Sequence, residues 1–325
     1  MNTTHAGQMQ AAQLRRFGGP EVLHLATVPI PVVGSNEVLV RVGACAINQH
    51  DTFVRDGTLK LMTGRKFPLG LGLDFAGEVL ATGPDVREVT TGSQVWGMVS
   101  PKKGHRTGAA AQYVVVPADR VAPYPVQLTV VEAASLVTVA ESALRALRDV
   151  AGTTPGDRVL VRGAAGGVGM ATVQLAHAMG AHVTALAQGR DTAFVTDCGA
   201  DVVLDYRTIS AQDVGPFDVI IDTAGGRGML RFRRRLTRRG RMVTLNFGSA
   251  SSMSAIAVST VFGAQRIRSF SGYPDRHLLN NVADYVQRGA LRPVVQAVYP
   301  LERIADAHRA LALPRQPGKL VLTTT

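Results

Sequence analysis

A strand, a glycine-rich turn and a helix follow one another directly in Val159–Gly169, and this order constrains the fold more than any other feature of the chain. In such a turn Gly166 lets the backbone approach a phosphate, and Gly169 lets the helix pack closely on the strand. Ala164 stands where the usual fingerprint has its first glycine. Because the turn places a pyrophosphate at a helix N-terminus, we predict a dinucleotide site. Its expected backbone contacts are Ala165, Gly166, Gly167, Val168 and Gly169.

Strands and helices alternate on both sides of this turn. A long helix is predicted first, over Val130–Val150, with Thr129 and Glu132 as its capping box. Repetition of strand, helix and strand at short spacing is typical of a doubly wound parallel sheet, so we expect a Rossmann domain. The predicted strands are Arg158–Arg162, His182–Ala187, Val202–Leu204, Asp218–Asp222 and Arg241–Leu245, and the helices between them include Gly166–Met179 and Arg190–Cys198.

Strand signals dominate the first third of the chain. Short apolar or alternating runs are separated there by Gly and Pro, a pattern that indicates a mostly antiparallel β domain. The clearest runs are Gln13–Leu14, Glu37–Val42, Asp74–Ala81 and Tyr113–Val116.

The end of the second Rossmann strand indicates which nicotinamide dinucleotide is bound. An NAD site usually has a carboxylate about 20 residues after the glycine turn, whereas this chain has none there until Asp191. Arg190 precedes it and suits a 2′-phosphate. Tyr206, just past the third strand, would line the adenine side. The sequence therefore favours NADPH over NADH.

Composition excludes several classes of protein. The chain has 325 residues, of which 46% are hydrophobic and 18% charged, as in ordinary globular proteins. Two cysteines, Cys45 and Cys198, are too few for a disulfide framework or a four-thiolate zinc site. No apolar run approaches the roughly 18 residues of a membrane span, and Met1–Gln10 has no signal-peptide pattern. We therefore expect a cytoplasmic protein that does not contact membranes.

The net charge of +11 is concentrated in Arg231–Arg241, in which seven residues are arginine. We interpret this segment as a solvated helix face that runs into a loop. The alternative is an electrostatic surface for RNA or DNA. Nucleic acid is the less favoured partner, because no aromatic platform or zinc-knuckle spacing accompanies the run.

With these residues the chain resembles the medium-chain dehydrogenase/reductase superfamily, in its zinc-free quinone oxidoreductase (zeta-crystallin-like) branch. The resemblance extends from Gln10 to Thr323. Besides the glycine turn, it is carried by Gly43–Asp51 (GACAINQHD), Gly72–Val79 (GLDFAGEV), Gly92–Gly97 (GSQVWG) and Gly318–Leu322 (GKLVL).

The resemblance implies two domains and a homodimer. A GroES-like, mostly antiparallel catalytic domain would consist of residues 1–129 and 275–325, and the Rossmann domain would cover 130–274. The last predicted strands and helix, Leu291–Tyr299, Ile304–Ala312 and Lys319–Leu322, would then rejoin the first domain. The apolar segment Ala255–Phe262 reads as an edge strand through which two subunits would associate.

Zinc enzymes of this superfamily have metal ligands that this chain lacks. Asn48 stands in place of a Cys ligand, Leu73-Asp74 in place of a His-Glu pair, and the lobe with four cysteines has no counterpart. Leu cannot bind zinc, and an amide binds it poorly. His50 and Asp51 are neighbours that point in different directions, so they are poor substitutes. We therefore predict no metal.

The resemblance also implies the residues around the nicotinamide. Asn48, the candidate catalytic residue, and Asp51 would line the floor of the cleft. Asn48 would hydrogen-bond the substrate oxygen or the nicotinamide ribose, and Asp51 has either a role there or a purely structural one. Lys319 would lie close to the cofactor. The other implied contacts are Thr138, Thr223, Ala224, Gly225, Asn246, Phe247 and Gly248.

One departure from the family pattern concerns the proton donor. Phe53 stands where many relatives have a tyrosine, and Phe has no proton to donate. Tyr124, Tyr273, His105 or water are the alternatives, and the sequence does not choose among them.

Loss of the metal decides which reaction is expected. Zinc polarises a carbonyl oxygen, whereas conjugated acceptors and quinones take hydride at carbon without it. We predict an NADPH-dependent oxidoreductase for a small electrophilic substrate, either a quinone or an activated α,β-unsaturated carbonyl. The alternatives are an enoyl-thioester or biosynthetic tailoring reductase of the same fold, and an RNA- or nucleotide-binding protein with vestigial reductase activity.

Overall fold

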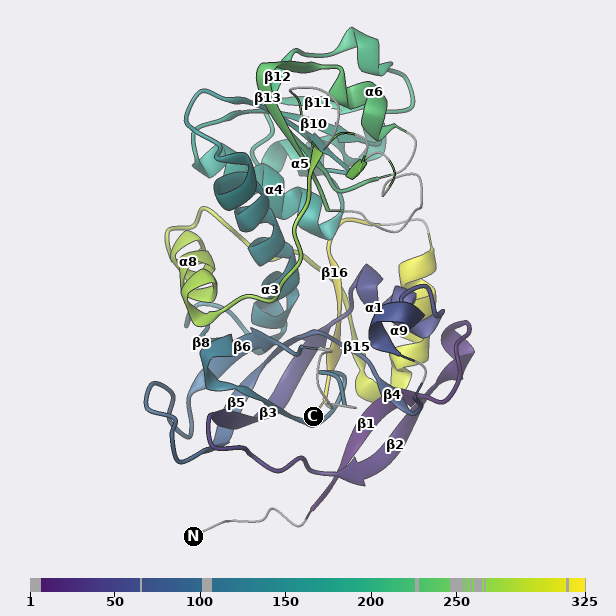
Figure 1. Ribbon diagram of the computed structural model, residues 1–325, viewed down its shortest axis with the longest axis vertical. Helices are drawn as coiled ribbons and strands as arrows, with labels where there is room; N and C mark the ends of the chain where they lie inside the picture. The colour runs from purple at the N-terminus through teal and green to yellow at the C-terminus, as the bar shows by residue number, and fades with distance from the viewer. Residues whose placement is uncertain are drawn as a thin grey trace.

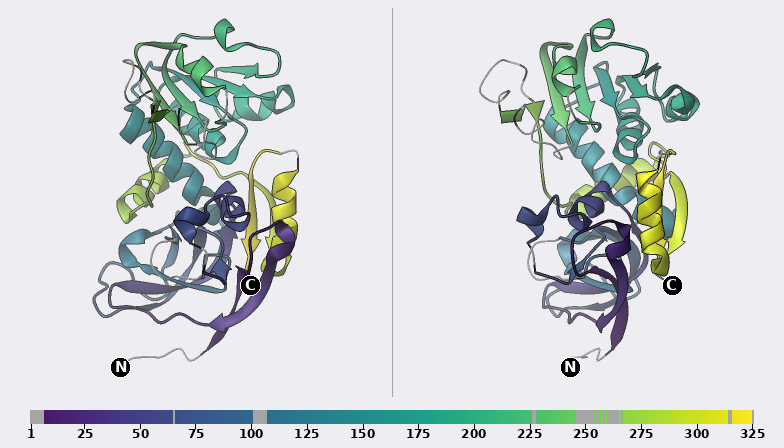
Figure 2. Two further views of the ribbon diagram at one scale, coloured as in Figure 1. Left: turned by 45° about the vertical axis from the view of Figure 1, so that its right-hand side comes forward. Right: turned by 90° about the vertical axis from the view of Figure 1, so that its right-hand side faces the viewer.

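The molecule has two halves, one built on a parallel sheet and the other on mostly antiparallel sheets, and one long helix lies between the halves (Figures 1 and 2). The computed structural model describes residues 7–64, 66–100, 107–225, 228–245, 254, 256–257, 259, 265, 267–313 and 316–324. A mostly antiparallel domain is combined with a parallel Rossmann domain, which confirms the predicted fold class. The strands of the mostly antiparallel half lie within residues 8–123 and 295–323, and those of the parallel sheet lie within residues 158–268; the domain bounds 1–129 with 275–325 and 130–274 stay a prediction.

The upper sheet in Figure 1 has six parallel strands in the order β11-β10-β9-β12-β13-β14. The first strand along the chain is central and later strands are added outward on both sides, as in dinucleotide-binding domains. Among the helices whose bounds the structure describes, α4 (Gly167–Ala178), α5 (Thr192–Asp197) and α6 (Met229–Arg233) follow strands of this sheet. The strands are β9 (Arg158–Arg162), β10 (His182–Ala187), β11 (Val202–Asp205), β12 (Phe217–Asp222), β13 (Leu236–Thr244) and β14 (Ile267–Arg268).

The lower half contains a seven-stranded and a three-stranded sheet. The large one comprises β3 (Glu37–Ala46), β5 (Asp74–Thr82), β6 (Gln94–Met98), β7 (Tyr113–Pro117), β8 (Val121–Pro123), β15 (Val295–Pro300) and β16 (Lys319–Thr323). The small one comprises β1 (Gln8–Leu14), β2 (Leu23–Pro29) and β4 (Leu69–Gly70). The end of the chain rejoins the first domain as expected, because β16 pairs antiparallel with β3, placing Val321 opposite Ala46.

Helices with described bounds also belong to the lower half and its border. They are α1 (Gln49–Arg55), α2 (Lys60–Thr63), α8 (Arg276–Gln287) and α9 (Ile304–Ala312). Figure 1 shows α1 and α9 next to each other beside β15 and β16. Among the described residues, no helix combines the length and the apolar character needed to cross a bilayer.

Helix α3 (Val130–Leu144) lies between the two halves and begins with the predicted capping box. The Thr129 hydroxyl accepts from the Glu132 N–H at 3.3 Å, and the Glu132 carboxylate accepts from the Thr129 N–H at 2.8 Å. The helix continues as a π-helix, η3 (Arg145–Ala151), and ends at Gly152 with a left-handed φ of 60°. One helix therefore belongs to the cores of both halves, and it connects their packing.

The arginine-rich segment differs from the predicted helix face. Helix α6 ends at Arg233, and β13 already begins at Leu236, which pairs with Phe217 and is buried. Pairing with β12 therefore prevails over the helical pattern. The Nε atom of Arg235 donates to the Val214 carbonyl at 2.6 Å, and that of Arg233 to the Gln265 carbonyl at 2.7 Å. Part of this charge thus holds the fold together.

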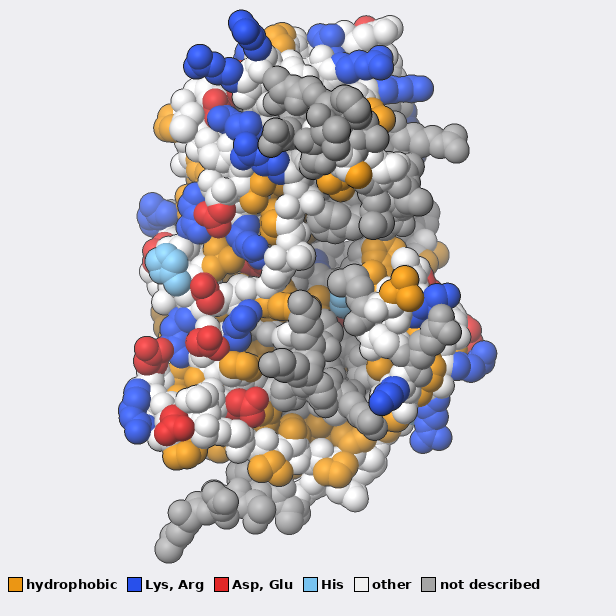
Figure 3. All heavy atoms as spheres, viewed as in Figure 1, with side chains coloured by type: hydrophobic (Ala, Val, Ile, Leu, Met, Phe, Trp, Pro, Cys, Tyr) orange, Lys and Arg blue, Asp and Glu red, His pale blue; other side chains and the backbone are white. Residues whose placement is uncertain are grey.

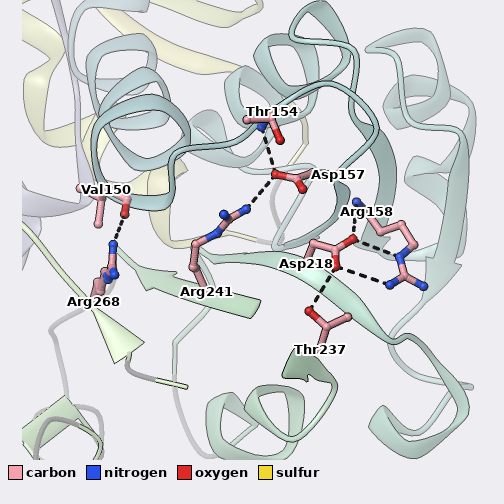
Figure 4. A network of polar contacts seen from close by, with 8 residues as sticks. All are labelled: Val150, Thr154, Asp157, Arg158, Asp218, Thr237, Arg241 and Arg268. Atoms are coloured by element: carbon pink, nitrogen blue, oxygen red, sulfur yellow. Dashed lines mark hydrogen bonds and ion pairs between the residues drawn. The ribbon is translucent and has the colours of Figure 1, made fainter. Parts of the chain in front are cut away.

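Further polar contacts fasten the amino-terminal edge of the upper sheet (Figure 4). Arg158 bonds Asp218 at 3.1 Å, and Arg241 bonds Asp157 at 2.8 Å. Arg268 of β14 donates to the Val150 carbonyl of η3 at 2.7 Å. Lys and Arg side chains remain at the surface of this half, where Figure 3 shows them around its upper end.

Only part of the predicted subunit contact, Ala255–Phe262, lies within the described residues. Ile256, Ala257 and Ser259 are helical there, so the strand prediction is wrong for these three residues. The Ser259 hydroxyl donates to the Ile256 carbonyl at 2.8 Å and accepts from the Ile267 N–H at 3.0 Å. These bonds hold a helical turn against β14. The outermost strand of the sheet is therefore β14, and not the segment that was predicted to be an edge strand.

Candidate functional site

The glycine turn joins β9 to the N-terminus of α4. Gly166 is the N-cap of this helix and has no side chain with which to bond its first N–H groups. Such N–H groups, together with the helix dipole, form an anion site. A Cβ atom at Gly169 would lie 2.1 Å from the Gly163 carbonyl oxygen, so α4 starts directly against the end of β9.

The tight turn itself is made by a residue that the sequence analysis did not single out. Gly163 has a φ of 78°, and a Cβ atom there would lie 2.6 Å from the Thr223 hydroxyl. That hydroxyl donates to the carbonyls of Arg162 at 2.7 Å and Gly163 at 3.2 Å. The residue that must be glycine is therefore Gly163, one position before Ala164, and this explains why alanine is accommodated at position 164.

A buried group of polar side chains lies where both halves meet. The Asn48 amide donates from Nδ2 to Asp74 Oδ2 at 3.0 Å and accepts at Oδ1 from Lys319 Nζ at 2.6 Å. The Thr138 hydroxyl donates to Asp74 Oδ1. Lys319 Nζ also donates to the Ile47 carbonyl at 2.7 Å. Three predicted site residues, from the start of α1, from α3 and from β16, thus meet around Asp74; we call Asn48, Asp74, Thr138 and Lys319 the floor network.

Asp74 was not predicted as a site residue, yet it is the centre of the floor network. Its side chain is fully buried, and burial raises its pKa, while the charge of Lys319 and the hydrogen bonds from Thr138 and Asn48 act in the opposite direction. The oxygen of the Asn48 amide accepts from Lys319, and its Nδ2 donates both to Asp74 and, at 3.4 Å, to the Ala46 carbonyl. Its role toward a substrate oxygen or the ribose stays a prediction.

Two roles were considered for Asp51, one in the cleft and one purely structural, and its contacts support the structural one. Its Oδ2 atom accepts from the Asn48 N–H at 2.7 Å, which completes the capping box of α1. Its Oδ1 atom accepts from the Gly72 N–H at 3.1 Å. Both oxygens are therefore used to fix the first turn of α1 beside the floor network.

Lys319 connects the floor network to the glycine turn. A Cβ atom at Gly167, the first residue of α4, would lie 3.2 Å from Lys319 Cδ and 3.0 Å from Val139 Cγ1. The aliphatic stem of Lys319 therefore lies against the helix N-terminus, and its ammonium group bonds Asn48. One side chain spans the distance from the expected pyrophosphate position to the floor of the site.

Arg190 and Tyr206 lie at the carboxyl ends of the neighbouring strands β10 and β11. The Arg190 side chain is 53% exposed, and it belongs to a 3-10 turn, η4 (Gly189–Asp191). Tyr206 is 49% exposed, and its hydroxyl accepts from Gln188 Nε2 at 2.8 Å. The structure thus brings both predicted residues to the same edge of the sheet, the edge at which dinucleotides bind in this type of fold.

A carboxylate that the sequence analysis missed stands beside them. Asp205, at the end of β11, accepts from the N–H groups of Gly189 and Arg207, each at 2.9 Å. The bond from Arg207 and then that from Gly189 hold the pKa of Asp205 below its usual range. This carboxylate comes from the third strand, whereas the usual fingerprint acid follows the second.

The predicted Thr223–Gly225 turn lies against the glycine turn. Buried Asp222 accepts from the N–H groups of Ala224 at 3.1 Å and Gly225 at 3.0 Å, and pairs with buried Arg162 at 2.8 Å. This pair fixes the ends of β9 and β12 side by side. The predicted contacts Asn246, Phe247 and Gly248 lie outside the described residues.

Glu141 lies nearly one helical turn beyond Thr138 on α3, and the sequence analysis passed it over. It is 3% exposed, accepts from the Ser142 hydroxyl at 3.0 Å, and has Arg145 at 3.6 Å. Burial raises its pKa to about 7. A buried acid that titrates near neutrality is typical of functional sites, although ion-pair networks also produce one.

Glu141→Gln should become progressively more stable than the unchanged protein as the pH rises. The pKa of Glu141 is raised from 4.5 to about 7 on folding. Ionisation therefore opposes folding, and the penalty grows between these two values and is constant above them. The difference in unfolding free energy between variant and parent should grow by about 3 kcal/mol from pH ~4 to pH ~8. Urea unfolding across this range measures it, and a constant difference would contradict the raised pKa.

Neither tyrosine considered as proton donor belongs to the floor network. The Tyr124 hydroxyl donates to Gln94 at 3.1 Å, and Tyr273 interacts with Ser100. Burial raises the pKa of both phenols. His105 lies outside the described residues. Within the described part of the chain, no three His, Cys, Asp or Glu side chains are arranged to hold a metal ion.

Comparisons with known proteins agree with this arrangement. The model of the alcohol dehydrogenase GroES-like domain matches residues 34–126, and that of the zinc-binding dehydrogenase domain matches residues 198–322. The bovine mitochondrial NAD(P)H oxidoreductase RTN4IP1 (Bos taurus) is 32% identical, over 97% of this chain and 89% of the relative. The quinone oxidoreductase of Sus scrofa is 31% identical, over 97% of both chains.

A solved structure has the same architecture over nearly the full length. The quinone oxidoreductase from Coxiella burnetii superposes with a TM-score of 0.89 at 30% identity, covering 98% of this chain and 100% of the other. The chain is an oxidoreductase with a site for a nicotinamide cofactor, and it belongs to the medium-chain dehydrogenase/reductase superfamily, in the quinone oxidoreductase branch.

Proposed function

We propose that this oxidoreductase transfers hydride from NADPH to a quinone or to an activated α,β-unsaturated carbonyl, without a metal. The observation that carries the proposal is the position of Lys319, whose stem lies against Gly167 of the glycine turn and whose ammonium group bonds Asn48. The turn and the floor network are thereby parts of one site. A dinucleotide on the turn would extend its nicotinamide end toward Thr138 and Asn48.

The residues present suit this cofactor. NADPH supplies a hydride when it is bound. The uncapped N-terminus of α4 provides N–H donors for a pyrophosphate, and the Thr223–Gly225 turn borders them. The floor network holds the Asn48 amide in one orientation, because Asp74 and Lys319 bond its two ends. The task of the chain is to position the reactants and to exclude water.

Metal independence follows from the same residues. The amide of Asn48 is bonded to Asp74 and Lys319. The Lys319 ammonium group lies 2.6 Å from the amide oxygen, so a metal cation bound to that oxygen would be repelled by it. The thiol of Cys45 is fully buried, and burial raises its pKa well above its usual range. A thiol in that state is a poor ligand. Full activity after treatment with a strong chelator is the expected result, and stoichiometric zinc in active protein would refute the assignment.

Preference for NADPH rests on Arg190. Its guanidinium suits a 2′-phosphate, and both oxygens of the nearby Asp205 are already bonded to backbone N–H groups. Arg190→Ala should raise the KM for NADPH about tenfold or more, the value of one charge-assisted contact, and change that for NADH little. Arg207→Ala, which removes a neighbouring arginine, is the matched control. Equal effects on both cofactors would remove Arg190 from the 2′-phosphate site.

The substrate class is tested directly by cofactor oxidation. We expect turnover with naphthoquinones or with alkenals, since Phe53 offers no proton and quinones depend least on an enzyme acid. Faster turnover with unsaturated acyl-CoA thioesters would favour the enoyl-thioester alternative. The homodimer, the cytoplasmic location and the absence of nucleic-acid partners stay predictions.

A further inference from the structure

A pocket of about 280 Å³ lies between α1 and α9, the helices that Figure 1 shows next to each other. This volume is slightly below the roughly 300–1,000 Å³ typical of small-molecule sites, so only a small ligand would fit. One face of α1 contributes residues at helical spacing, and one face of α9 opposes it. The lining residues are Gln49, Thr52, Arg55, His308, Leu311, Ala312 and Leu313.

Arg55 is a buried cation without an anionic partner in the described part of the chain. Its side chain is 7% exposed, and burial lowers its pKa. Its Nε donates to the Gly18 carbonyl at 3.2 Å, and its Nη1 to His308 Nδ1 at 2.9 Å. No described carboxylate forms an ion pair with Arg55, although the charges of Asp56 and Glu21 act on its pKa against the effect of burial. Buried charges are normally paired, because desolvation of an unpaired one is costly.

His308 adds a second donor to the same pocket. A guanidinium has no acceptor atom, so Nδ1 of the histidine must be the acceptor and the ring proton is on Nε2. Burial lowers the pKa of His308 to about 4, and the ring is therefore neutral near neutral pH. The side chain is 2% exposed, and Nε2 has no partner among the described residues. The Thr52 hydroxyl also borders the pocket.

The remaining wall is apolar. Leu311, Ala312 and Leu313 also line the pocket, and Leu313 is 64% exposed, so the pocket opens to solvent beside it. A guanidinium fork binds a planar carboxylate through two parallel bonds, and it suits this shape better than a spherical ion. An aliphatic tail would cover the leucines.

We propose that this pocket binds a small organic carboxylate, with its charged end on Arg55 and His308 and its apolar part on Leu311 and Leu313. The charge of Asp51, which caps α1, acts on His308. The site is distinct from that of the proposed hydride transfer: its lining residues on α1 lie on the side of the helix that borders the pocket, whereas Asn48, the N-cap of α1, belongs to the floor network. Binding here therefore stands or falls independently of cofactor and quinone.

Calorimetric titration of the full chain at constant ionic strength tests the proposal with butyrate, acetate and inorganic phosphate as probes. Saturable binding of butyrate, tighter than that of acetate and phosphate, is the expected result. Tighter binding of phosphate would overturn the assignment to a carboxylate, and the absence of saturable binding for all three would overturn the site.

Variants locate the binding and separate it from folding. Arg55→Lys keeps the charge but removes the fork, and Ala312→Phe fills the pocket without touching either polar residue; each should weaken butyrate binding at least tenfold. Arg309→Gln, which removes an exposed arginine on α9 next to His308, is the matched control and should bind like the parent. If Arg55→Lys folds poorly, Ala312→Phe still tests the site, because it leaves the buried Arg55 in place. Unchanged affinity in Ala312→Phe would contradict the location.

Discussion

Replacing Lys319 with Met should lower the free energy of unfolding by about 3–5 kcal/mol near neutral pH, the usual effect of removing one partner of a buried charge pair. Met keeps the length of the stem that lies against Gly167. What disappears is the ammonium group, which bonds Asn48 and Ile47 and lowers the pKa of Asp74. Asp74, fully buried, would then lack this compensating charge.

A double-mutant cycle separates charge from packing. Asp74→Asn alone leaves Lys319 buried without its counter-charge, whereas Lys319→Met with Asp74→Asn removes both charges. The double variant should therefore be more stable than the sum of the single effects predicts, by about 1–3 kcal/mol. Lys60→Met, at an exposed position of α2, is the control and should change stability by less than about 0.5 kcal/mol.

The pH dependence gives the sign of the effect independently. Burial raises the pKa of Asp74, so in Lys319→Met the carboxyl escapes its penalty by protonation when the pH falls. The deficit of the variant should accordingly shrink from neutral toward acidic pH. Chemical unfolding of variant and parent at neutral and at acidic pH measures the difference in their free energies of unfolding. A variant within about 1 kcal/mol of the parent at neutral pH would mean that Asp74 carries no charge in the folded protein.

Local patterns were sufficient to predict the elements that carry the site. The strands Arg158–Arg162 and His182–Ala187 and the helix Ile304–Ala312 have the bounds predicted for them. Each is marked by a local pattern, a short run between turn residues for the strands and helical periodicity for the helix. The glycine turn was identifiable for the same reason. Its glycines are adjacent in sequence to the strand and helix that they join, so no knowledge of distant contacts was needed.

The sequence was least informative where pairing of distant strands decides. Asp74 becomes the centre of the floor network only because β3, β5 and β16 are neighbours in one sheet, which brings Asn48 and Lys319 together across 271 positions. Asp205 reaches Gly189 because β11 pairs with β10. Leu236 is a strand residue, despite the helical pattern around it, because Phe217 pairs with it. None of these registers is encoded in a local pattern.

Valine at position 169 should prevent the fold, whereas valine at position 166 should preserve it and abolish cofactor binding. At Gly169 a Cβ atom would lie 2.1 Å from the Gly163 carbonyl oxygen and 2.8 Å from Ala164 Cα. Both are backbone atoms and cannot rotate away, so α4 would have to leave β9. Loss of this packing should cost more than about 4 kcal/mol, as severe overpacking does.

Gly166 offers more room but lies at the anion site. Its backbone is extended, with φ −79° and ψ 164°, which valine tolerates, and its Cβ atom would lie 3.3 Å from the Gly163 carbonyl oxygen. We therefore expect a stability cost of about 1 kcal/mol. The added side chain would stand at the N-cap of α4, where the pyrophosphate is expected to approach the N–H groups. Affinity for NADPH should fall at least about a hundredfold. This is two tenfold steps, each of which corresponds to roughly 1.4 kcal/mol.

The two variants together distinguish a cofactor turn from a merely tight one. Circular dichroism and urea unfolding report the fold, and fluorescence titration with NADPH and NADH reports binding to the same samples. Gly166→Ala is the graded control, since its single methyl group keeps the contact at 3.3 Å and adds no branch. If Gly166→Val keeps full affinity for both dinucleotides, the N-terminus of α4 does not hold their phosphates. The link through Lys319 would then connect the floor network only to a structural turn.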